Sequence, residues 1–185
     1  MRLILLGAPG SGKGTQAEIL AERIGVPSIS TGEMLRRAVA AGSELGNKVR
    51  AIMSTGELVD DDTMAAVVRE RLGQADAEVG FILDGYPRTL GQADTLASIL
   101  DAKSWSLDAV VHIEVPEEEL ITRALARQRA DDQEEVIRQR QRVYLQQTQP
   151  LIDHYEGQGL LCAINGHQAI DEVAHDVVSA LEVTR

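Results

Sequence analysis

Cysteine is almost absent from the 185-residue sequence, because Cys162 is its only instance. A single cysteine excludes an intrachain disulfide and a cysteine cluster for zinc. Cys162 lies in the apolar run 160–164, where we expect it to act as a small buried hydrophobe. Aromatic residues make up only 3% of the chain, so the core must be built mainly from Leu, Ile, Val and Ala.

Basic charge is also scarce. The formal net charge is −11, which argues against a general nucleic-acid binder or a membrane-surface binder, since both need a basic face. The chain has 15 arginines and only 3 lysines. The planar guanidinium suits phosphate oxygens, so this skew is consistent with anion recognition, although compositional drift explains it equally well.

Long apolar runs are missing as well, and none approaches the length of a membrane span. The apolar start at residues 1–6 is too short, and too soon followed by glycine, to be a signal peptide. We therefore expect a cytoplasmic protein by default.

Short apolar runs alternate with longer helical patterns along the whole chain. Continuous apolar strands separated by helices indicate a parallel sheet that is covered on both faces. There is no internal repeat or linker, so we predict one α/β domain over residues 1–185. The runs expected to be strands are 3–6, 26–29, 81–83, 109–115 and 160–164.

Several helix starts can be predicted from local patterns. Ser30 and Glu33 have the spacing of a capping box, in which each side chain satisfies the other residue's backbone N–H. The acidic run 60–62 suits the positive end of a helix, and Pro116 suits a first helical turn. Another helix is expected from about residue 134 to about residue 147.

The strongest local signal is the segment GAPGSGKGT at residues 7–15, between an apolar strand and a helical pattern. Its glycines allow several backbone N–H groups to point at one oxyanion, and the following helix adds its positive end. Lys13 would place an ammonium group against the β- and γ-phosphates. The candidate ATP-phosphate ligands are Gly10, Ser11, Gly12, Lys13, Gly14 and Thr15.

The loop departs from the general phosphate-binding pattern at the residue after the lysine. A Ser or Thr that holds Mg²⁺ is usual there, but this chain has Gly14, and the hydroxyl comes one residue later in Thr15. This form resembles the loop of nucleoside monophosphate kinases. Asp84 ends the apolar run 81–83, near the expected ligand crevice, and we assign it to Mg²⁺ through water, with Thr15 as a second candidate.

A second phosphate site is suggested by the segment DGYPR at residues 84–88. Arg88 can grip a phosphate with two parallel hydrogen bonds, and the amide of Gln92 can pair with a base edge. The segment resembles DG(F/Y)PR of adenylate kinases. That resemblance assigns to AMP binding Gly85, Tyr86, Pro87, Arg88 and Gln92.

The segment STGEMLR at residues 30–36 resembles a further motif of the same family. If Ser30 caps the helix, the hydroxyl of Thr31 is free for a ligand, and Arg36 lies about one turn further along. The related UMP/CMP kinases usually have Ala at the position of Thr31 and Asn at the position of Thr89, so both residues favour AMP. The segment GELV at 56–59 resembles the stretch whose backbone packs on the acceptor base, here Glu57, Leu58 and Val59.

Arginines cluster between residues 123 and 142. Helical spacing places Arg140 on the buried side of its helix, where a guanidinium needs an anionic partner. By the same spacing Arg138 and Arg142 lie on a solvated face. The segment RADD at residues 129–132 resembles the end of the adenylate kinase lid.

The resemblance implies a role for each of the other arginines. Arg127 would bind ATP, Arg129 and Arg140 would bind phosphates near the transfer point, and Arg123 would stack on the ATP base. The loop at 165–168, including Gln168, would touch that base by backbone. Only Gln128 separates Arg127 from Arg129, which matches the short form of the lid without a zinc site.

The adenylate kinase resemblance covers nearly the whole chain. It implies a P-loop NTPase-type three-layer α/β/α fold with a five-stranded parallel sheet, an NMP-binding lid at 30–59 and a short ATP lid at 126–132. It also implies a monomeric enzyme that uses Mg²⁺ and handles ATP, AMP and ADP, with Lys13, Arg88, Arg129 and Arg140 as catalytic residues. UMP or CMP as acceptor, a P-loop kinase for a small metabolite such as shikimate, and an ATP-binding switch without transfer activity remain the alternatives.

Overall fold

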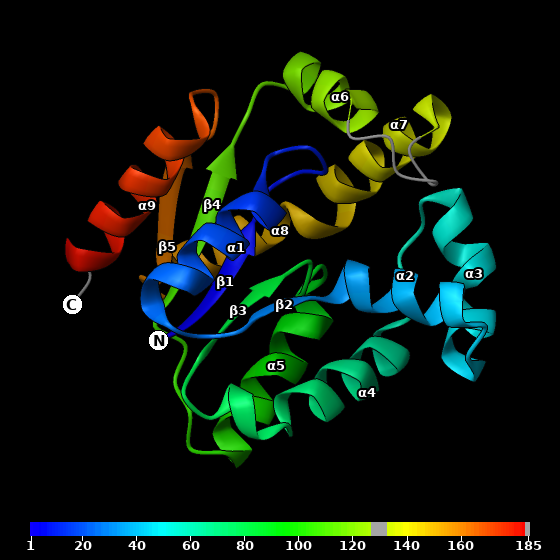
Figure 1. Ribbon diagram of the computed structural model, residues 1–185, viewed down its shortest axis with the longest axis horizontal. Helices are drawn as coiled ribbons and strands as arrows, with labels where there is room; N and C mark the ends of the chain where they lie inside the picture. The colour runs from blue at the N-terminus through cyan, green and yellow to red at the C-terminus, as the bar shows by residue number, and fades with distance from the viewer. Residues whose placement is uncertain (127–132, 184–185) are drawn as a thin grey trace.

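The computed structural model describes residues 1–126 and 133–183 of the chain. Five parallel strands form one sheet in the order β2-β3-β1-β4-β5 (Figure 1). The strands are β1 (Arg2–Leu6), β2 (Ser28–Ser30), β3 (Phe81–Asp84), β4 (Ala109–Glu114) and β5 (Leu161–Asn165). The five apolar runs therefore give the five predicted strands.

Helices connect the strands along the chain. They are α1 (Lys13–Ile24), α2 (Thr31–Ala41), α3 (Glu44–Thr55), α4 (Asp61–Leu72), α5 (Leu90–Ala102), α6 (Glu117–Ala126), α7 (Glu134–Val143), α8 (Pro150–Glu156) and α9 (Ile170–Val183). A short 3₁₀ turn, η1, covers Ala75–Ala77, and a π-helical segment, η2, covers Tyr144–Thr148. The described part of the chain contains no helix with the length and apolar character needed to cross a membrane.

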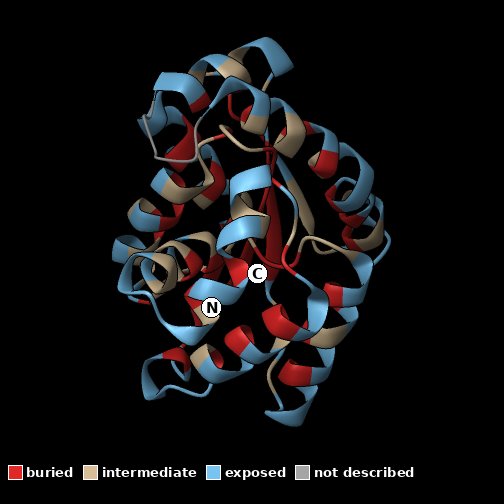
Figure 2. Ribbon diagram, turned by 90° about the vertical axis from the view of Figure 1, so that its right-hand side faces the viewer, coloured by how far each residue is buried: buried red, intermediate tan, exposed pale blue. Residues whose placement is uncertain are grey.

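Two apolar clusters lie on opposite faces of the sheet, because successive side chains of β1 point to opposite sides. Ile4 and Leu6 pack toward α4, α5 and α8, whereas Leu3 and Leu5 pack toward α1 and α9. Figure 2 shows the buried residues along the strands and on the inner sides of the helices. The expected three-layer α/β/α architecture is confirmed.

The strand register brings the carboxyl ends of the central strands to one edge of the sheet. Asp84 pairs in register with Leu5 on one side and with Ser30 on the other, and Leu6 pairs with His112. β1 lies between β3 and β4, so its connection to α1 leaves the sheet at the point where the strand order reverses. Ligands of open α/β sheets bind in the crevice at such a point.

Two local predictions differ from the structure. The expected capping box is wrong, because the Ser30 side chain makes no cap hydrogen bond; its hydroxyl lies 3.0 Å from Asp84 Oδ2, while Glu33 pairs with Arg37. The helix expected from 134 to about 147 begins at Glu134 but widens into the π-helical η2 after Val143. The helix start predicted at the acidic run 60–62 is confirmed: α4 begins at Asp61, and the Asp60 carboxylate caps it by accepting from Thr63 N at 2.8 Å.

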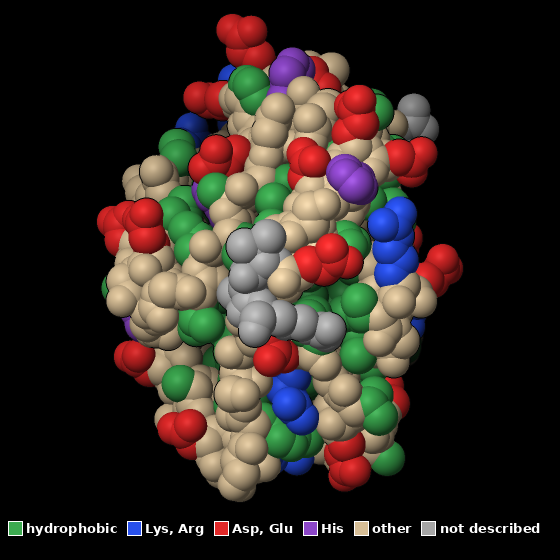
Figure 3. All heavy atoms as spheres, turned by 90° about the vertical axis from the view of Figure 1, so that its left-hand side faces the viewer, with side chains coloured by type: hydrophobic (Ala, Val, Ile, Leu, Met, Phe, Trp, Pro, Cys, Tyr) green, Lys and Arg blue, Asp and Glu red, His purple; other side chains and the backbone are tan. Residues whose placement is uncertain are grey.

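Acidic side chains are spread over the face that carries α9, with few Lys and Arg among them (Figure 3). This distribution agrees with the net charge of −11. A polyanion would find no broad basic surface on this face.

Candidate active site

A cavity of about 640 Å³ opens at the carboxyl ends of the central strands. It is lined by the loop after β1, by α2 and the segment after α3, by the connection from β3 to α5, and by α7 and η2. Most of the predicted site residues lie on its wall: Gly10, Ser11, Gly12, Lys13, Gly14, Thr15, Thr31, Arg36, Glu57, Leu58, Val59, Asp84, Gly85, Pro87, Arg88, Gln92, Arg123, Arg140 and Gln168.

The loop between β1 and α1, here called the anion cradle because its motif predicts phosphate binding, is curled by Gly7, Gly10 and Gly12 with positive φ. Gly12 has φ +94° and caps α1, so Lys13 is the first helical residue. Lys13 Nζ donates to the carbonyl oxygens of Gly7 at 2.6 Å and Ala8 at 3.0 Å. A Cβ on Gly10 would lie 2.4 Å from the Leu120 carbonyl oxygen, so no larger residue fits there. The helix end and the lysine thus face one cavity, as the motif predicts.

Asp84 lies beside the first turn of α1. Its Oδ2 accepts a hydrogen bond from the Ser30 hydroxyl at 3.0 Å and would be 3.8 Å from a Cβ at position 14. The absence of a side chain at Gly14 leaves room beside the carboxylate. No group of three or more His, Cys, Asp or Glu residues in the described chain is arranged to hold a metal ion. Mg²⁺ is usually held by one or two carboxylates plus phosphates and water, so a lone Asp84 fits that ion.

Arg88 is held by its own turn on the other wall of the cavity. Its Nε donates to the Gly85 carbonyl at 2.8 Å, and its backbone carbonyl accepts from the Thr148 hydroxyl at 2.9 Å. Burial lowers the pKa of the Arg88 guanidinium; nearby Asp84 opposes this shift and Arg140 adds to it. A partly buried cationic group of this kind favours an anionic ligand.

The Thr31 hydroxyl is buried and donates to the Gly85 carbonyl at 2.9 Å. It therefore ties the start of α2 to the turn that carries Arg88. Arg36, one turn along α2, is partly buried and lines the same cavity.

Two arginines of the cluster, Arg123 and Arg140, approach the cavity from separate helices. The Cγ of Arg140 lies 3.3 Å from where a Cβ on Gly56 would be, so α7 touches the segment after α3. Arg123 Nη1 donates to the Gly166 carbonyl at 3.1 Å, and Arg123 Nε donates to Glu119 at 2.8 Å. Arg138 and Arg142, which were predicted to face solvent, are exposed.

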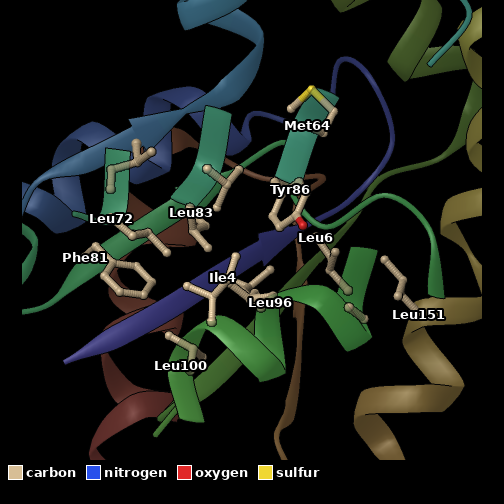
Figure 4. Packing of buried hydrophobic residues seen from close by; sticks show 14 of the residues in the cluster. Ile4, Leu6, Met64, Leu72, Phe81, Leu83, Tyr86, Leu96, Leu100 and Leu151 are labelled. Atoms are coloured by element: carbon tan, nitrogen blue, oxygen red, sulfur yellow. The ribbon is translucent and has the colours of Figure 1, made fainter. Parts of the chain in front are cut away.

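Tyr86 is predicted to bind AMP, but it does not line this cavity. Tyr86 is only 1% exposed, and its side chain lies among Leu6, Met64 and Leu83 in the core (Figure 4). Its ring therefore serves packing, and only its backbone belongs to the turn. Arg127 and Arg129 lie outside the described residues.

The structure adds two residues that the sequence did not single out. Tyr144 lines the cavity, and its hydroxyl lies 3.3 Å from His112 Nε2. Thr148 also lines it and fixes the Arg88 carbonyl. Both belong to η2, which no local sequence pattern predicts, so their positions become visible only in three dimensions.

Known proteins are similar to this chain over nearly its whole length. The family model described as adenylate kinase matches residues 5–160. An adenylate kinase of Stenotrophomonas maltophilia is 47% identical over 98% of this chain and 100% of its own length. Archaeoglobus fulgidus has one that is 44% identical over 98% of both chains, and adenylate kinase 1 of a Synechocystis species is 49% identical over 93% of this chain and 92% of its own. The chain belongs to the adenylate kinase family.

Proposed function

We propose that the protein transfers the γ-phosphoryl group of Mg·ATP to AMP and forms two molecules of ADP. One observation carries the proposal: Lys13 of the anion cradle and Arg88 of the second predicted phosphate site line the same cavity. A nucleoside triphosphate and a monophosphate can then share one cavity.

The donor side of the reaction uses the loop between β1 and α1. Its backbone N–H groups and Lys13 bind the β- and γ-phosphates, while Arg123, Arg127 and Gln168 hold the rest of ATP. Mg²⁺, when bound near Asp84 and Thr15, neutralises charge on the phosphates.

The acceptor side uses α2, the segment after α3 and the turn before α5. Arg36 and Arg88 bind the AMP phosphate, and Gln92 pairs with the base. Thr31, Leu58 and Val59 complete the wall beside it. The phosphate of a nucleoside monophosphate ionises with a second pKa of about 6. AMP is therefore already a nucleophile at neutral pH, and no general base is needed.

Catalysis rests on position and charge. We assign to the guanidinium groups of Arg88, Arg129 and Arg140 the role of balancing the charge on the oxygens of the phosphoryl group in transit. Water must be kept out, or ATP would be hydrolysed. We assign this to closure of the segments 30–59 and 126–132 as lids. The enzyme acts as a monomer in the cytoplasm and needs no nucleic acid or membrane.

The alternative functions make different demands on the acceptor site. A UMP or CMP kinase would keep the chemistry but change the acceptor. A kinase for a small metabolite would not need a nucleotide-shaped pocket with Gln92 in its wall. An ATP-binding switch would need no second phosphate site.

One assay separates these readings. Purified protein is incubated with Mg·ATP and with AMP, UMP, CMP, GMP or shikimate in turn, and the ADP formed is measured. We expect rapid ADP formation with AMP only. Faster turnover with another acceptor would refute the proposal, and so would a rate of ADP formation that does not depend on which acceptor is present.

A further inference from the structure

The side-chain amide of Gln92 is held by two protein groups that determine where its oxygen and its nitrogen lie. Its Oε1 accepts from the backbone N–H of Arg88 at 2.8 Å, and its Nε2 donates to Asp61 Oδ1 at 2.8 Å. A carboxylate only accepts and a backbone N–H only donates. A reversed amide would place oxygen against carboxylate and N–H against N–H, so both neighbours enforce the same orientation.

Asp61 is itself fixed. Its Oδ2 accepts from the Thr89 hydroxyl at 3.0 Å, and the same hydroxyl accepts from Gln92 N at 3.1 Å. A Cβ on Gly91 would come within 3.0 Å of Oδ2. The carboxylate is thus tied to the first turn of α5 by both oxygens, although it belongs to the first turn of α4.

These contacts leave part of the amide free. A glutamine amide has two hydrogens and two oxygen lone pairs, and each neighbour uses one. One N–H and one lone pair remain on a side chain that is 2% exposed and lines the cavity. The free N–H can donate to a ring nitrogen of a base, and the free lone pair can accept from a neighbouring amino group. Adenine presents these two groups side by side. A 6-oxopurine presents a ring N–H beside a carbonyl and needs the reversed amide.

We propose that Asp61 is a specificity-determining positioning residue, which locks the Gln92 amide so that the acceptor pocket prefers a 6-aminopurine over a 6-oxopurine. This inference rests on the proposed function. Asp61 is absent from the cavity wall, so it acts through Gln92 and does not touch the base.

The sharpest probes are AMP and IMP, which differ only in replacement of the 6-amino group by oxygen and in the N1 proton. The test variant is Asp61→Asn, because an asparagine amide can face Gln92 with either its oxygen or its nitrogen. The matched control is Asp62→Asn, which removes the same charge from the next exposed residue in the same helical turn.

The readout is kcat/KM for AMP and for IMP at saturating Mg·ATP. In the Asp61→Asn variant the AMP:IMP ratio should fall about tenfold, the size expected for one charged hydrogen bond, mainly through a higher KM for AMP. The ratio should not change in the Asp62→Asn variant. The base edge of CMP has the same acceptor and amino group as adenine. In the Asp61→Asn variant, kcat/KM for CMP should therefore fall by about the same factor as kcat/KM for AMP.

Several results would overturn the inference. One is an unchanged AMP:IMP ratio in an active Asp61→Asn variant, and another is an equal fall in both variants. A purely structural role would lower kcat/KM for both substrates alike and leave the ratio intact. If the unmodified protein forms no ADP with AMP, the proposed function and this inference both fail.

A second measurement tests whether Asp61 acts only through Gln92, and it is made at low temperature so that a destabilised variant stays folded. The Asp61→Asn change is repeated in a Gln92→Leu background, and AMP and IMP binding is measured by calorimetry at 10 °C. We expect no further change in the AMP:IMP affinity ratio, because no amide is left to orient. A further drop in that ratio would mean that Asp61 acts on the base by another route, which refutes the proposal.

Discussion

At the scale of single residues, the surroundings of Arg88 explain why an arginine is needed. Its Nε is already engaged with the Gly85 carbonyl, and Thr148 holds its backbone. Among the described residues, no hydrogen bond involves the two terminal nitrogens, and Arg88 lines the cavity. A lysine would offer one mobile point charge in the same desolvated space.

We therefore predict that Arg88→Lys lowers kcat by at least about 100-fold, since a donor that stabilises a transition state is typically worth that much. Steady-state ADP formation from Mg·ATP and AMP measures the effect. Arg138→Lys is the matched control, because Arg138 is exposed and bonds to Glu134 within its own helix. Near-normal turnover of Arg88→Lys would contradict the assigned role.

His112 is buried on β4 beneath the anion cradle. Its Nε2 lies 3.3 Å from the Tyr144 hydroxyl and its Nδ1 lies 3.3 Å from Glu114 Oε1. Burial lowers the pKa of His112 below its ordinary value of 6.5; Glu114 opposes this shift, and the charge of Lys13 adds to it. The folded protein therefore favours neutral His112.

This shift predicts how stability depends on pH. Below about pH 6.5 the unfolded chain binds a proton at His112 that the folded protein does not, so the free energy of unfolding falls as pH drops. The slope due to one histidine is at most about 1.4 kcal/mol per pH unit. Urea unfolding of the unmodified protein and of His112→Gln at pH 5.5, 6.5 and 7.5 measures it. The difference between the two should shrink toward low pH, and a difference that is constant with pH would refute this assignment.

The motif residues lie together on the cavity wall, whereas predictions from local pattern failed where a distant partner competes. Ser30 has the local spacing of a capping residue, but the parallel register places Asp84 beside it, 54 residues away in sequence. Tyr86 follows a strand whose side chains alternate, and its ring turns into the core. Asp61 was predicted to lie at the start of a helix, and it does. Its contact with Gln92 was not predicted, because that contact depends on how α4 packs against α5.

At the scale of elements, strands were the easier prediction. Each strand of a covered parallel sheet is a continuous apolar run, so its composition marks it without help from tertiary structure. The π-helical turn of η2 has no such signature, because its wider hydrogen-bond pattern depends on neighbours such as Arg88 and His112. The sequence therefore predicted the sheet and the phosphate loop but not the wall that η2 contributes.

The packing of α2 against α3 depends on one glycine. A Cβ on Gly46 would lie 2.0 Å from the Ala38 carbonyl oxygen and 2.6 Å from Val39 N. Alanine is favoured over glycine in a helix by about 1 kcal/mol, but overpacking typically costs about 1–3 kcal/mol, and a contact this short lies at the severe end. We therefore expect the steric clash to outweigh the gain in helix propensity.

We predict that Gly46→Ala pushes α3 away from α2, lowers the free energy of unfolding by about 1–3 kcal/mol and raises the KM for AMP more than the KM for ATP. Thermal unfolding and steady-state kinetics check both parts. Ser54→Ala, on the exposed side of the same helix, is the control and should change neither KM. Equal stability of Gly46→Ala and the unmodified protein would show that the two helices can separate freely.

At the scale of the whole molecule, the fold explains why two phosphate sites meet. The parallel register brings the ends of β1, β2 and β3 together, and each end continues into a segment that lines the cavity. The α7 helix reaches across to the segment after α3, where Gln139 Nε2 donates to Glu57 at 2.6 Å. Cationic groups are thus concentrated in one cleft of a protein whose net charge is −11.

The most direct test of this account follows the phosphoryl group itself. Protein in excess over ATP labelled at the γ-phosphate is mixed with Mg²⁺, with and without AMP, and the products are separated after a single turnover. With AMP, we predict that the label that leaves ATP is found in ADP and not in inorganic phosphate; without AMP, ATP stays intact. Label that is released as inorganic phosphate at the same rate whether or not AMP is present would contradict direct transfer within one closed cavity.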